Sequence, residues 1–242
     1  MRTLSSSTTS AFVCCFTDLS FSLSSQVFTV IIMSMKNCHC QMGGFALSTV
    51  AWLLCCISIG LPQWQVWHYE DPVILKPTVA FVGVWRACVF HTDSNSSNNR
   101  VCHQYNYRDS FIPFYIRVNQ HLLLVSSFLG LFGKITTIIA LSNVGMGRVR
   151  RNATRNPFSL PGILNTIVSS FLYFAVLLNY IAILRKWGVA FPPSFHMPSH
   201  PDTQKMGSAM ALAIIAAVFF LLSGIICLSS NLSIGKKPHP KI

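Results

Sequence analysis

Two cysteines, Cys88 and Cys102, are the residues of this chain whose type and position most clearly allow covalent chemistry. They lie in a polar segment between two long apolar segments. A cysteine pair in such a segment, outside a membrane, is expected to be oxidised, because the cell surface is an oxidising environment. Closing a loop of about 15 residues also removes roughly 3 kcal/mol of entropy from the unfolded chain. We therefore expect a disulfide between Cys88 and Cys102 on the outside of a cell.

The other cysteines do not form a disulfide framework, although the chain has nine in total. Cys55, Cys56 and Cys227 fall within apolar segments, where cysteine behaves as a small hydrophobic residue. The triplet Cys38-His39-Cys40 has the right residue types for a metal, but no second ligand pair follows at the spacing of a zinc site. Ordinary thiols are the simpler interpretation, and we predict no metal site.

The remaining polar residues do not indicate catalysis. An enzyme needs a nucleophile, a base or a metal in a shared cleft, whereas the eight histidines are scattered along the chain. His91 and His103 could approach one another near the cysteine pair, but loop histidines without a metal explain them as well. The chain has no glycine-rich phosphate loop and no His-x-x-x-His pair. We expect no enzyme activity and no cofactor.

Composition indicates a protein that crosses a membrane several times. Of 242 residues, 52% are hydrophobic and 10% are charged, which is too apolar for a typical soluble domain. The formal net charge of +12 would indicate nucleic-acid binding in a soluble protein. Here the basic residues gather near the ends of apolar segments, as juxtamembrane residues commonly do. We therefore expect the lipid bilayer as a partner, and no nucleic acid.

Four apolar segments are each about long enough to cross the hydrocarbon core. We place the spans at residues 43–61, 121–143, 161–184 and 207–228. The predicted fold class is a membrane protein with a bundle of four transmembrane helices. Lys134 lies well inside the second span, where a charge is costly. Snorkelling of its ammonium toward the inner surface is favoured over a polar contact inside the bundle.

The distribution of basic residues indicates how the spans are oriented. Segment 144–160 contains four arginines, so the positive-inside rule places it in the cytoplasm. Segments 62–120 and 185–206 are then extracellular, and both termini are cytoplasmic, including a short tail at 229–242. Residues 1–42 form an atypical extension before the first span. Disorder is the favoured interpretation, and a marginal extra span or sequence upstream of the usual start are the alternatives.

The first extracellular segment is expected to contain strands. Residues 79–85 are β-branched and aromatic and follow Pro77, which is typical of a strand. Residues 105–107 alternate in polarity and form a second candidate. Residues 93–99, between the cysteines, form a turn-prone stretch. Within it, Asn95 begins an Asn-Ser-Ser triplet and is a candidate N-glycosylation site if it faces the lumen.

Trp64, the run Gly83-Val84-Trp85, Cys88 and Cys102 follow one another in an order that resembles the claudin signature. That signature is a tryptophan, then Gly-Leu-Trp, then two cysteines, and Val84 replaces its leucine. The motif is fairly specific when four spans surround it. The resemblance runs from about residue 41 to the C-terminus, and within the family the chain looks most like a divergent member.

The resemblance implies a small extracellular antiparallel β-sheet, made by both extracellular segments and pinned by Cys88 and Cys102. It implies structural roles for Trp64, Gly83 and Trp85. In claudins, copies line up in one membrane and meet copies from the next cell, so that their sheets form a paracellular barrier. The implied function is a structural or adhesive component of tight junctions in the plasma membrane. The implied partners are the chain itself and other claudins, both in cis and in trans.

The resemblance to claudins also implies where ion selectivity would arise. Charge near the second cysteine helps to choose the permeant ion, which makes His103 a candidate selectivity position, and histidine is mostly neutral at pH 7. The charges of the first extracellular segment nearly balance, so a barrier or adhesion role is favoured over a cation pore. Claudins usually carry an arginine at the outer entrance of span two. Gln120 takes that place here, with Arg117 one turn earlier, and this departure bears on whether the chain forms strands.

The C-terminus bears on a further partner. Many claudins end in Tyr-Val and bind PDZ domains by strand addition. This chain ends in Pro240-Lys241-Ile242, and Pro240 lacks the N–H that an added strand would use. PDZ binding is therefore disfavoured. Related tetraspan families share the Trp and Cys motif, so an auxiliary subunit of a channel or receptor is the alternative function. A lone membrane-organising protein is a third.

Overall fold

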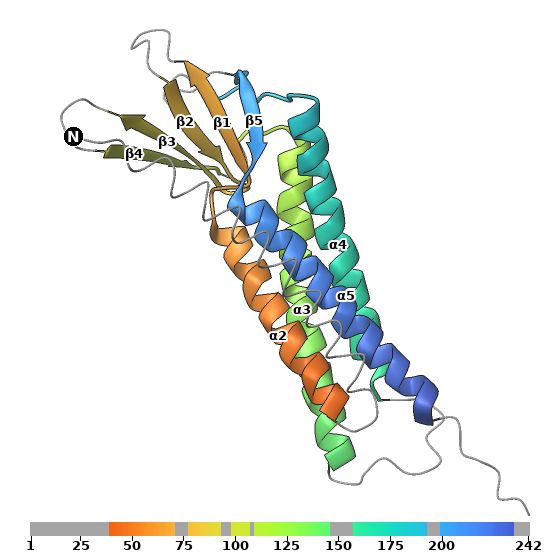
Figure 1. Cartoon of the computed structure of the whole chain (residues 1–242). Helices are drawn as coiled ribbons and strands as arrows, with labels where there is room; N and C mark the ends of the chain where they lie inside the picture. Colours follow the sequence, from red (N-terminus) through yellow and green to blue (C-terminus); the bar gives the residue numbers. More distant parts are fainter. Residues whose placement is uncertain are drawn as a thin grey trace, which may run out of the picture.

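The computed structural model describes residues 39–70, 77–92, 98–106, 109–145, 157–192 and 199–234. Within these residues, four long helices form a bundle, and a five-stranded antiparallel sheet lies at one end of it (Figure 1). The sequence therefore predicts the fold class correctly: a tetraspan bundle with a small sheet.

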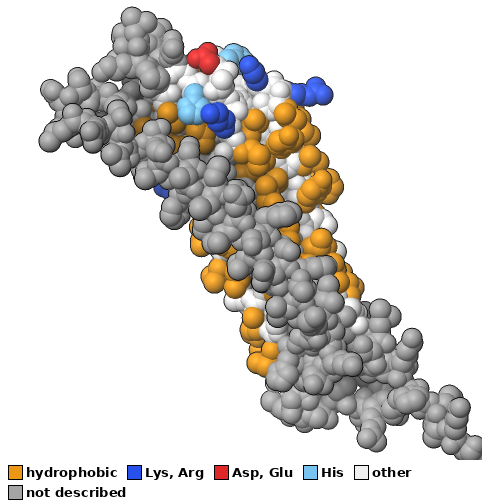
Figure 2. All heavy atoms as spheres, viewed as in Figure 1, with side chains coloured by type: hydrophobic (Ala, Val, Ile, Leu, Met, Phe, Trp, Pro, Cys, Tyr) orange, Lys and Arg blue, Asp and Glu red, His pale blue; other side chains and the backbone are white. Residues whose placement is uncertain are grey.

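The bundle consists of α2 (His39–Gly60), α3 (Phe114–Gly145), α4 (Ser159–Leu184) and α5 (Ser208–Ile234). Each helix contains a stretch long and apolar enough to cross a membrane. In lipid, a helix satisfies its own backbone hydrogen bonds, which is why such stretches fold in this way. Their outward faces carry many exposed aliphatic and aromatic side chains. Figure 2 shows these hydrophobic side chains along the visible helix surface.

Helices α4 and α5 approach closely through small residues. A Cβ atom on Gly224 would lie 2.6 Å from Oγ1 of Thr166, so a larger residue does not fit there. The hydroxyl of Ser169 donates a hydrogen bond to the carbonyl of Ala217, at 2.8 Å. Close packing and such hydrogen bonds hold helices together in lipid, because the hydrophobic effect contributes little between them.

Polar contacts also join the helices inside the bundle. Asn165 of α4 donates to the hydroxyl of Ser223 on α5 (3.1 Å), which donates to the carbonyl of Gly44 on α2 (2.8 Å). Lys134 of α3 is buried, and its ammonium lies 5.3 Å from the centre of the Phe220 ring on α5. The expectation that Lys134 snorkels toward the inner surface is therefore wrong. Its charge lies over an aromatic face, where a cation is attracted to the ring.

The sheet consists of β1 (Gln65–Glu70), β2 (Pro77–Val82), β3 (Arg86–Thr92), β4 (Asn98–Gln104) and β5 (Thr203–Met206). Its strand order is β4-β3-β2-β1-β5, and every neighbouring pair is antiparallel. The first four strands lie between α2 and α3, whereas β5 lies between α4 and α5. Because β5 pairs with β1, the two segments at this end of the bundle form one sheet.

Alternation along the strands gives the sheet two different faces. The inner face packs against the start of α3, through Tyr115 and Ile116, and against the segment after α4, through Val189. Its buried side chains are Trp67, Tyr69, Ala80, Val82, Ala87 and Val89. The outer face carries the alternate residues. On it, Phe81 and Phe90 pack edge to face with 5.0 Å between ring centres.

The second span begins earlier than the sequence indicates. Helix α3 starts at Phe114 and not at residue 121, so the expected segment 62–120 is too long at its C-terminal end. The first turns of α3 contain polar residues, which hide them from a hydropathy pattern. They are helical because Tyr115 and Ile116 pack beneath the sheet, in the part of the helix nearest the strands.

The first and last helices extend beyond the expected spans at the ends nearest the chain termini. Helix α2 begins at His39, inside the expected extension 1–42, and α5 continues to Ile234, inside the expected tail 229–242. Helix α4 begins at Ser159, close to the expected residue 161. The rest of both terminal segments and most of the loop 144–160 lie outside the described residues.

The two expected strands are also corrected. The strand at 79–85 is too long, because β2 ends at Val82 and the chain turns before β3 begins at Arg86. The N–H of Gly83 closes this turn by donating to the carbonyl of Arg86, at 2.9 Å. The strand expected at 105–107 is wrong over its described residues 105 and 106, because β4 ends at Gln104 and Tyr105 is buried in the cluster beneath the sheet. Residue 107 lies outside the described residues.

Candidate functional site

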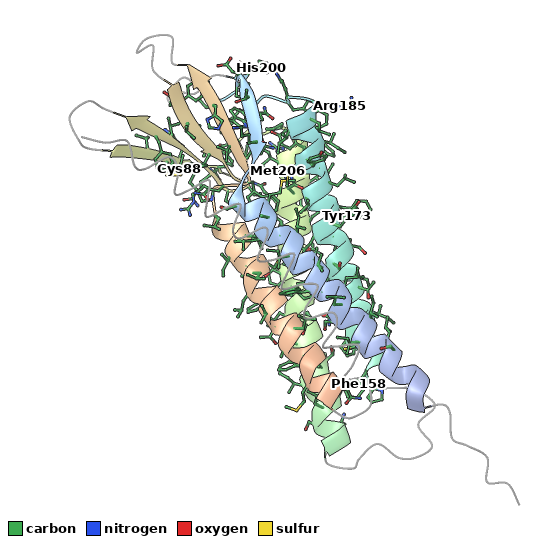
Figure 3. The ribbon with its side chains drawn as sticks, in the orientation of Figure 1. Cys88, Phe158, Tyr173, Arg185, His200 and Met206 are labelled. Atoms are coloured by element: carbon green, nitrogen blue, oxygen red, sulfur yellow. A yellow bond between two sulfur atoms is a disulfide. The ribbon has the colours of Figure 1, made fainter. Side chains whose placement is uncertain are left out.

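The sheet has a covalent link between β3 and β4. Cys88 and Cys102 form a disulfide, and the two residues lie directly opposite one another in the strand register. Figure 3 labels Cys88 on β3, whose side chain is buried, while that of Cys102 on β4 is exposed. Because β4 is an edge strand with β3 as its single neighbour, the disulfide attaches this edge of the sheet covalently.

Trp64 lies where the first helix, the sheet and the last helix meet. Its side chain is fully buried, and its indole N–H donates to the carbonyl of Ser58 at 2.9 Å. Its own carbonyl accepts from the N–H of Gly207, at 3.1 Å. A side chain on Gly207 would collide with the carbonyl of Gln63. Trp64 therefore holds the end of α2 against the start of α5, at the base of the sheet.

Gly83 occupies the turn between β2 and β3, where the chain is crowded by backbone. A Cβ atom at this position would lie 2.7 Å from Cα of Pro62 and 2.9 Å from the carbonyl oxygen of Arg86. Backbone atoms cannot move aside as a flexible side chain can. A glycine is therefore required at position 83, because the segment that follows α2 passes so close to this turn.

Val84 and Trp85 connect this turn to its neighbours. The Val84 side chain is buried, and its carbonyl accepts a hydrogen bond from Nε2 of Gln120 on α3, at 2.9 Å. The carbonyl of Trp85 accepts from the N–H of Tyr105, at 2.9 Å. The four signature residues thus act in packing and in backbone contacts.

Buried amides attach the sheet to the bundle. The indole N–H of Trp67 donates to Oε1 of Gln65 (3.0 Å), and Nε2 of Gln65 donates to Oδ1 of Asn179 on α4 (3.3 Å). All three side chains are buried. These residues are absent from the sequence prediction. Asn179 is a polar residue within a mostly apolar span, and that is the signal that the sequence offers for it.

The cluster beneath the sheet also contains Tyr105, a phenol whose pKa is raised. Burial is the main cause of the raised pKa of Tyr105, and the neighbouring Tyr115 phenol adds to it. Tyr105 and Phe191 lie with their rings nearly parallel, 6.3 Å between centres. The cluster beneath the sheet is therefore neutral at physiological pH and serves for packing.

The two remaining candidate positions are His103, the possible selectivity position, and Asn95, the possible glycosylation site. His103 lies opposite Ala87 in the register, on the alternate side of β4 from Cys102, and its side chain is half-buried. Its role in selectivity stays a prediction. Asn95, the candidate glycosylation site, lies outside the described residues. In the part of the chain that the structure describes, no three His, Cys, Asp or Glu residues gather as they would around a metal ion.

The outer face of the sheet is basic in its described part. Val66 faces Lys205 across β1 and β5, and Arg86 lies on β3 on the same face, where its guanidinium donates to the carbonyl of Gly60 at 2.8 Å. His68 lies two residues after Val66, on this face. Burial, and then the charge of Lys205, lower its pKa below the ordinary 6.5. Figure 2 shows Lys, Arg and His side chains at this end of the molecule.

Gln120 and Arg117 lie on the first turns of α3, at the entrance of the second span nearest the sheet. Gln120 is buried beneath the turn that contains Val84. Arg117 reaches back instead, and its guanidinium donates to the carbonyl of Asp109 at 2.6 Å. The two residues therefore attach α3 to different parts of the chain, one to the strand turn and the other to the loop before the helix.

Comparison with known proteins gives relatives for most of the chain. The family model described as PMP-22/EMP/MP20/Claudin tight junction matches residues 49–229. Claudin-1 of Mus musculus is 27% identical over 118 residues, which are 48% of this chain and 50% of that protein. Claudin-7 of Mus musculus is 29% identical over 98 residues, 40% of this chain and 43% of that protein. Claudin-2 of Mus musculus is 26% identical over 206 residues, 81% of each chain.

The matched region contains every element that builds the site. The match to claudin-1 spans about half the length of that protein. The match to the family model is longer and extends from the first helix through the sheet and into the last helix. Four membrane-spanning helices, an antiparallel sheet and a disulfide between neighbouring strands agree with that match. The chain therefore belongs to the claudin family.

Proposed function

We propose that this chain is a structural and adhesive component of tight junctions, which forms or modulates a paracellular barrier between adjacent cells. One observation carries the proposal: β5 pairs with β1, so both segments outside the bundle contribute to one sheet. A sheet fixed to four spans at its base can project from the cell as a rigid body. The family description names the tight junction, and the relatives of the chain are claudins.

The orientation that this role requires follows from the charges of the chain. The sheet and its disulfide lie outside the cell, and both termini and the arginine-rich loop 144–160 lie in the cytoplasm. The protein then resides in the plasma membrane at cell–cell contacts. Its partners are further copies of itself and other claudins, side by side in one bilayer and across the gap between cells.

A barrier fits the charge on the sheet better than a cation pore. Arg86 and Lys205 are the cationic side chains described on the outer face, and His68 beside them is mostly neutral because its pKa lies below 6.5. A surface of one sign repels ions of that sign within about a Debye length, roughly 8 Å at physiological ionic strength. Cations passing along this face would meet repulsion.

The roles of the signature residues in this proposal are structural. Trp64, Gly83, Val84 and Trp85 keep the base of the sheet against the bundle, and the disulfide fixes its edge strand. Family membership implies a structural protein and not an enzyme. His103 keeps a place in the proposal as a selectivity position, and its test is the change in ion preference when it is replaced by an acidic residue.

Expression in cells that lack tight junctions tests the proposal. The chain should concentrate at contacts between two expressing cells, and freeze-fracture images should show continuous strands there. Diffuse surface distribution, together with co-purification of a channel or receptor, would instead support the alternative role as an auxiliary subunit. A variant with Gly83→Ala, which disturbs the base of the sheet, should lose the strands.

A further inference from the structure

Lys134 places a cation inside the bundle, among helices that contain no acidic residue. The six acidic residues of the chain lie elsewhere in the sequence: Asp18, Glu70, Asp71, Asp93, Asp109 and Asp202. The Lys134 side chain is 7% exposed, and its ammonium forms no hydrogen bond with the part of the chain that the structure describes. The Phe220 ring, 5.3 Å away, covers one side of the ammonium. An ammonium has three N–H donors, so a single ring leaves donors unpaired.

Asn165, on the facing helix α4, brings an unpaired acceptor to the same region. Its side chain is 1% exposed, and its Nδ2 atom donates to the hydroxyl of Ser223. Its Oδ1 atom, by contrast, forms no hydrogen bond with any described residue. This oxygen lies against α3, because a Cβ atom on Gly133, the residue before Lys134, would be 3.0 Å from it. Leaving a buried polar atom unpaired is unfavourable, so both groups need a partner.

Helix α5 shows that the two groups lie at the same level of the bundle. The Lys134 ammonium lies over Phe220 and also interacts electrostatically with Cys227. Ser223, the partner of Asn165, lies between Phe220 and Cys227 on α5 and hydrogen bonds with Cys227. Residues at these spacings share one face of a helix. Lys134 and Asn165 therefore meet on the same face of α5.

The two unpaired atoms determine what kind of ligand fits between them. The Lys134 ammonium can only donate a hydrogen bond, and Oδ1 of Asn165 can only accept one. A ligand that binds both must accept from the first and donate to the second. A halide ion could accept from the ammonium but has no proton to donate to the amide oxygen. A water molecule does both, and buried waters bind polar groups that the chain leaves unpaired.

We propose that Lys134 and Asn165 bind an internal water molecule that joins α3 to α4, in the half of the bundle farther from the sheet. The water accepts from Nζ of Lys134 and donates to Oδ1 of Asn165. Asn165 donates to Ser223, and Ser223 donates to the carbonyl of Gly44. These bonds already link α4, α5 and α2, so the water adds α3 and connects all four helices. The buried lysine is thereby a water-binding residue of the bundle.

Thermal unfolding of the purified full chain tests the water bridge. Lys134→Met keeps an unbranched side chain but removes the ammonium, and the unfolding midpoint should fall by about 2–6 °C. Lys205→Met, at an exposed lysine of β5, is the control and should change the midpoint little. An equal or higher midpoint for Lys134→Met would overturn the proposal, because removing a buried charge that has no partner is neutral or stabilising.

A double-mutant cycle separates the bridge from the contact of Lys134 with Phe220. In an Asn165→Leu background the acceptor of the water is gone, so Lys134→Met should lower the midpoint little further. Loss of the ring contact alone would lower the midpoint equally in both backgrounds, and such additive effects would contradict the bridge. Replacing chloride by gluconate at constant ionic strength should leave the midpoint of the parent chain unchanged. A midpoint that falls without chloride would show that an anion occupies the site in place of water.

Rapid radiolytic labelling with mass spectrometry detects the water in the parent chain and does not depend on a variant that folds. Hydroxyl radicals formed from a bound water modify the side chains beside it. Cys227 should be labelled several-fold more than Cys55, which is also buried and outside any disulfide but lies in the apolar cluster of the bundle. Equal labelling of the two cysteines would overturn the proposal. So would labelling of Cys227 that is unchanged in the Lys134→Met variant. Neither measurement involves cell contacts, so the result is independent of the barrier function.

Discussion

The side-chain amide of Gln120 donates a hydrogen bond to the main-chain carbonyl of Val84, with 2.9 Å between the nitrogen and oxygen atoms. Both residues are buried, so this bond joins the start of α3 to the turn that contains the family signature. The resemblance to claudins predicts an arginine at the position that Gln120 occupies. In this chain a neutral amide makes the connection, and no charge has to be buried there.

Replacing Gln120 by leucine should destabilise the protein by about 1 kcal/mol. The Val84 carbonyl would lose its donor, while the loss of Oε1, which has no partner among the described residues, offsets part of the cost. Thermal unfolding of the purified protein in detergent measures the effect. Gln104→Leu, on the exposed surface of β4, is the control and should change the midpoint little. Equal midpoints for the two variants would show that the bond to Val84 contributes nothing.

Gly83→Ala should cost about 1–3 kcal/mol, because the added Cβ would meet backbone atoms that cannot move aside. The control is Gly43→Ala, since a Cβ at Gly43 has nothing within 4 Å. That change should be neutral or slightly stabilising, because alanine favours a helix more than glycine does. The same unfolding assay compares them. A stable Gly83→Ala variant would mean that the chain after α2 passes the turn less closely.

Loss of the disulfide should destabilise the sheet by roughly 3 kcal/mol, the entropy of closing a loop of about 15 residues. The change is the double substitution of Cys88 and Cys102 by serine. Cys56→Ser, in the first span, is the matched control because Cys56 is a free thiol. The fraction of protein that reaches the cell surface and its resistance to protease report the difference. Equal values for both variants would show that β4 stays attached without the bond.

The fold class was predictable because its causes are local in the sequence. Four apolar segments must become helices in lipid, and the order of Trp64, Gly83 and the two cysteines identifies the sheet that accompanies them. Element boundaries were less predictable. The start of α3 is helical through packing of Tyr115 and Ile116 beneath the sheet, and that contact depends on strands far away in the chain. Hydropathy alone does not contain it.

The contacts of the candidate site were predictable only in part. The pairing of Cys88 with Cys102 follows from their types and setting. Strand β5, by contrast, contains only Thr203–Met206, and a four-residue polar stretch gives no strand signal until its partner β1 is known. The run from Val79 to Trp85 looks continuous because its turn is made of a glycine and two apolar residues. The close approach that requires glycine in this turn involves Pro62, which lies outside the run.

The pH dependence of His68 provides a test of the outer face. Its pKa lies below 6.5 because of burial first and Lys205 second. The folded state therefore binds a proton less readily than the unfolded state. The neutral His68 side chain therefore stabilises the folded state at pH values above its ordinary pKa of 6.5. This stabilisation is lost as the pH falls through the pKa that His68 has in the folded protein. Lys205→Met should raise the pKa of His68 only part of the way, because burial remains.

Carbon-13 NMR of histidine-labelled protein in micelles measures this titration, with His68→Gln to assign the signal. Met206→Leu, on the same strand but opposite Gln65, is the matched control and should leave the pKa nearly unchanged. A pKa of His68 that stays constant or falls in the Lys205→Met variant would show that the two side chains do not interact across β1 and β5.

Electrical measurement across an epithelial monolayer tests most directly whether these sheets seal the space between cells. Cells of low resistance that express the chain should gain transepithelial resistance, and their dilution potential should show no preference for cations. The variant lacking Cys88 and Cys102 should leave the resistance at the parental value. An unchanged resistance with the intact chain at cell contacts, or a fall accompanied by cation selectivity, would contradict the barrier.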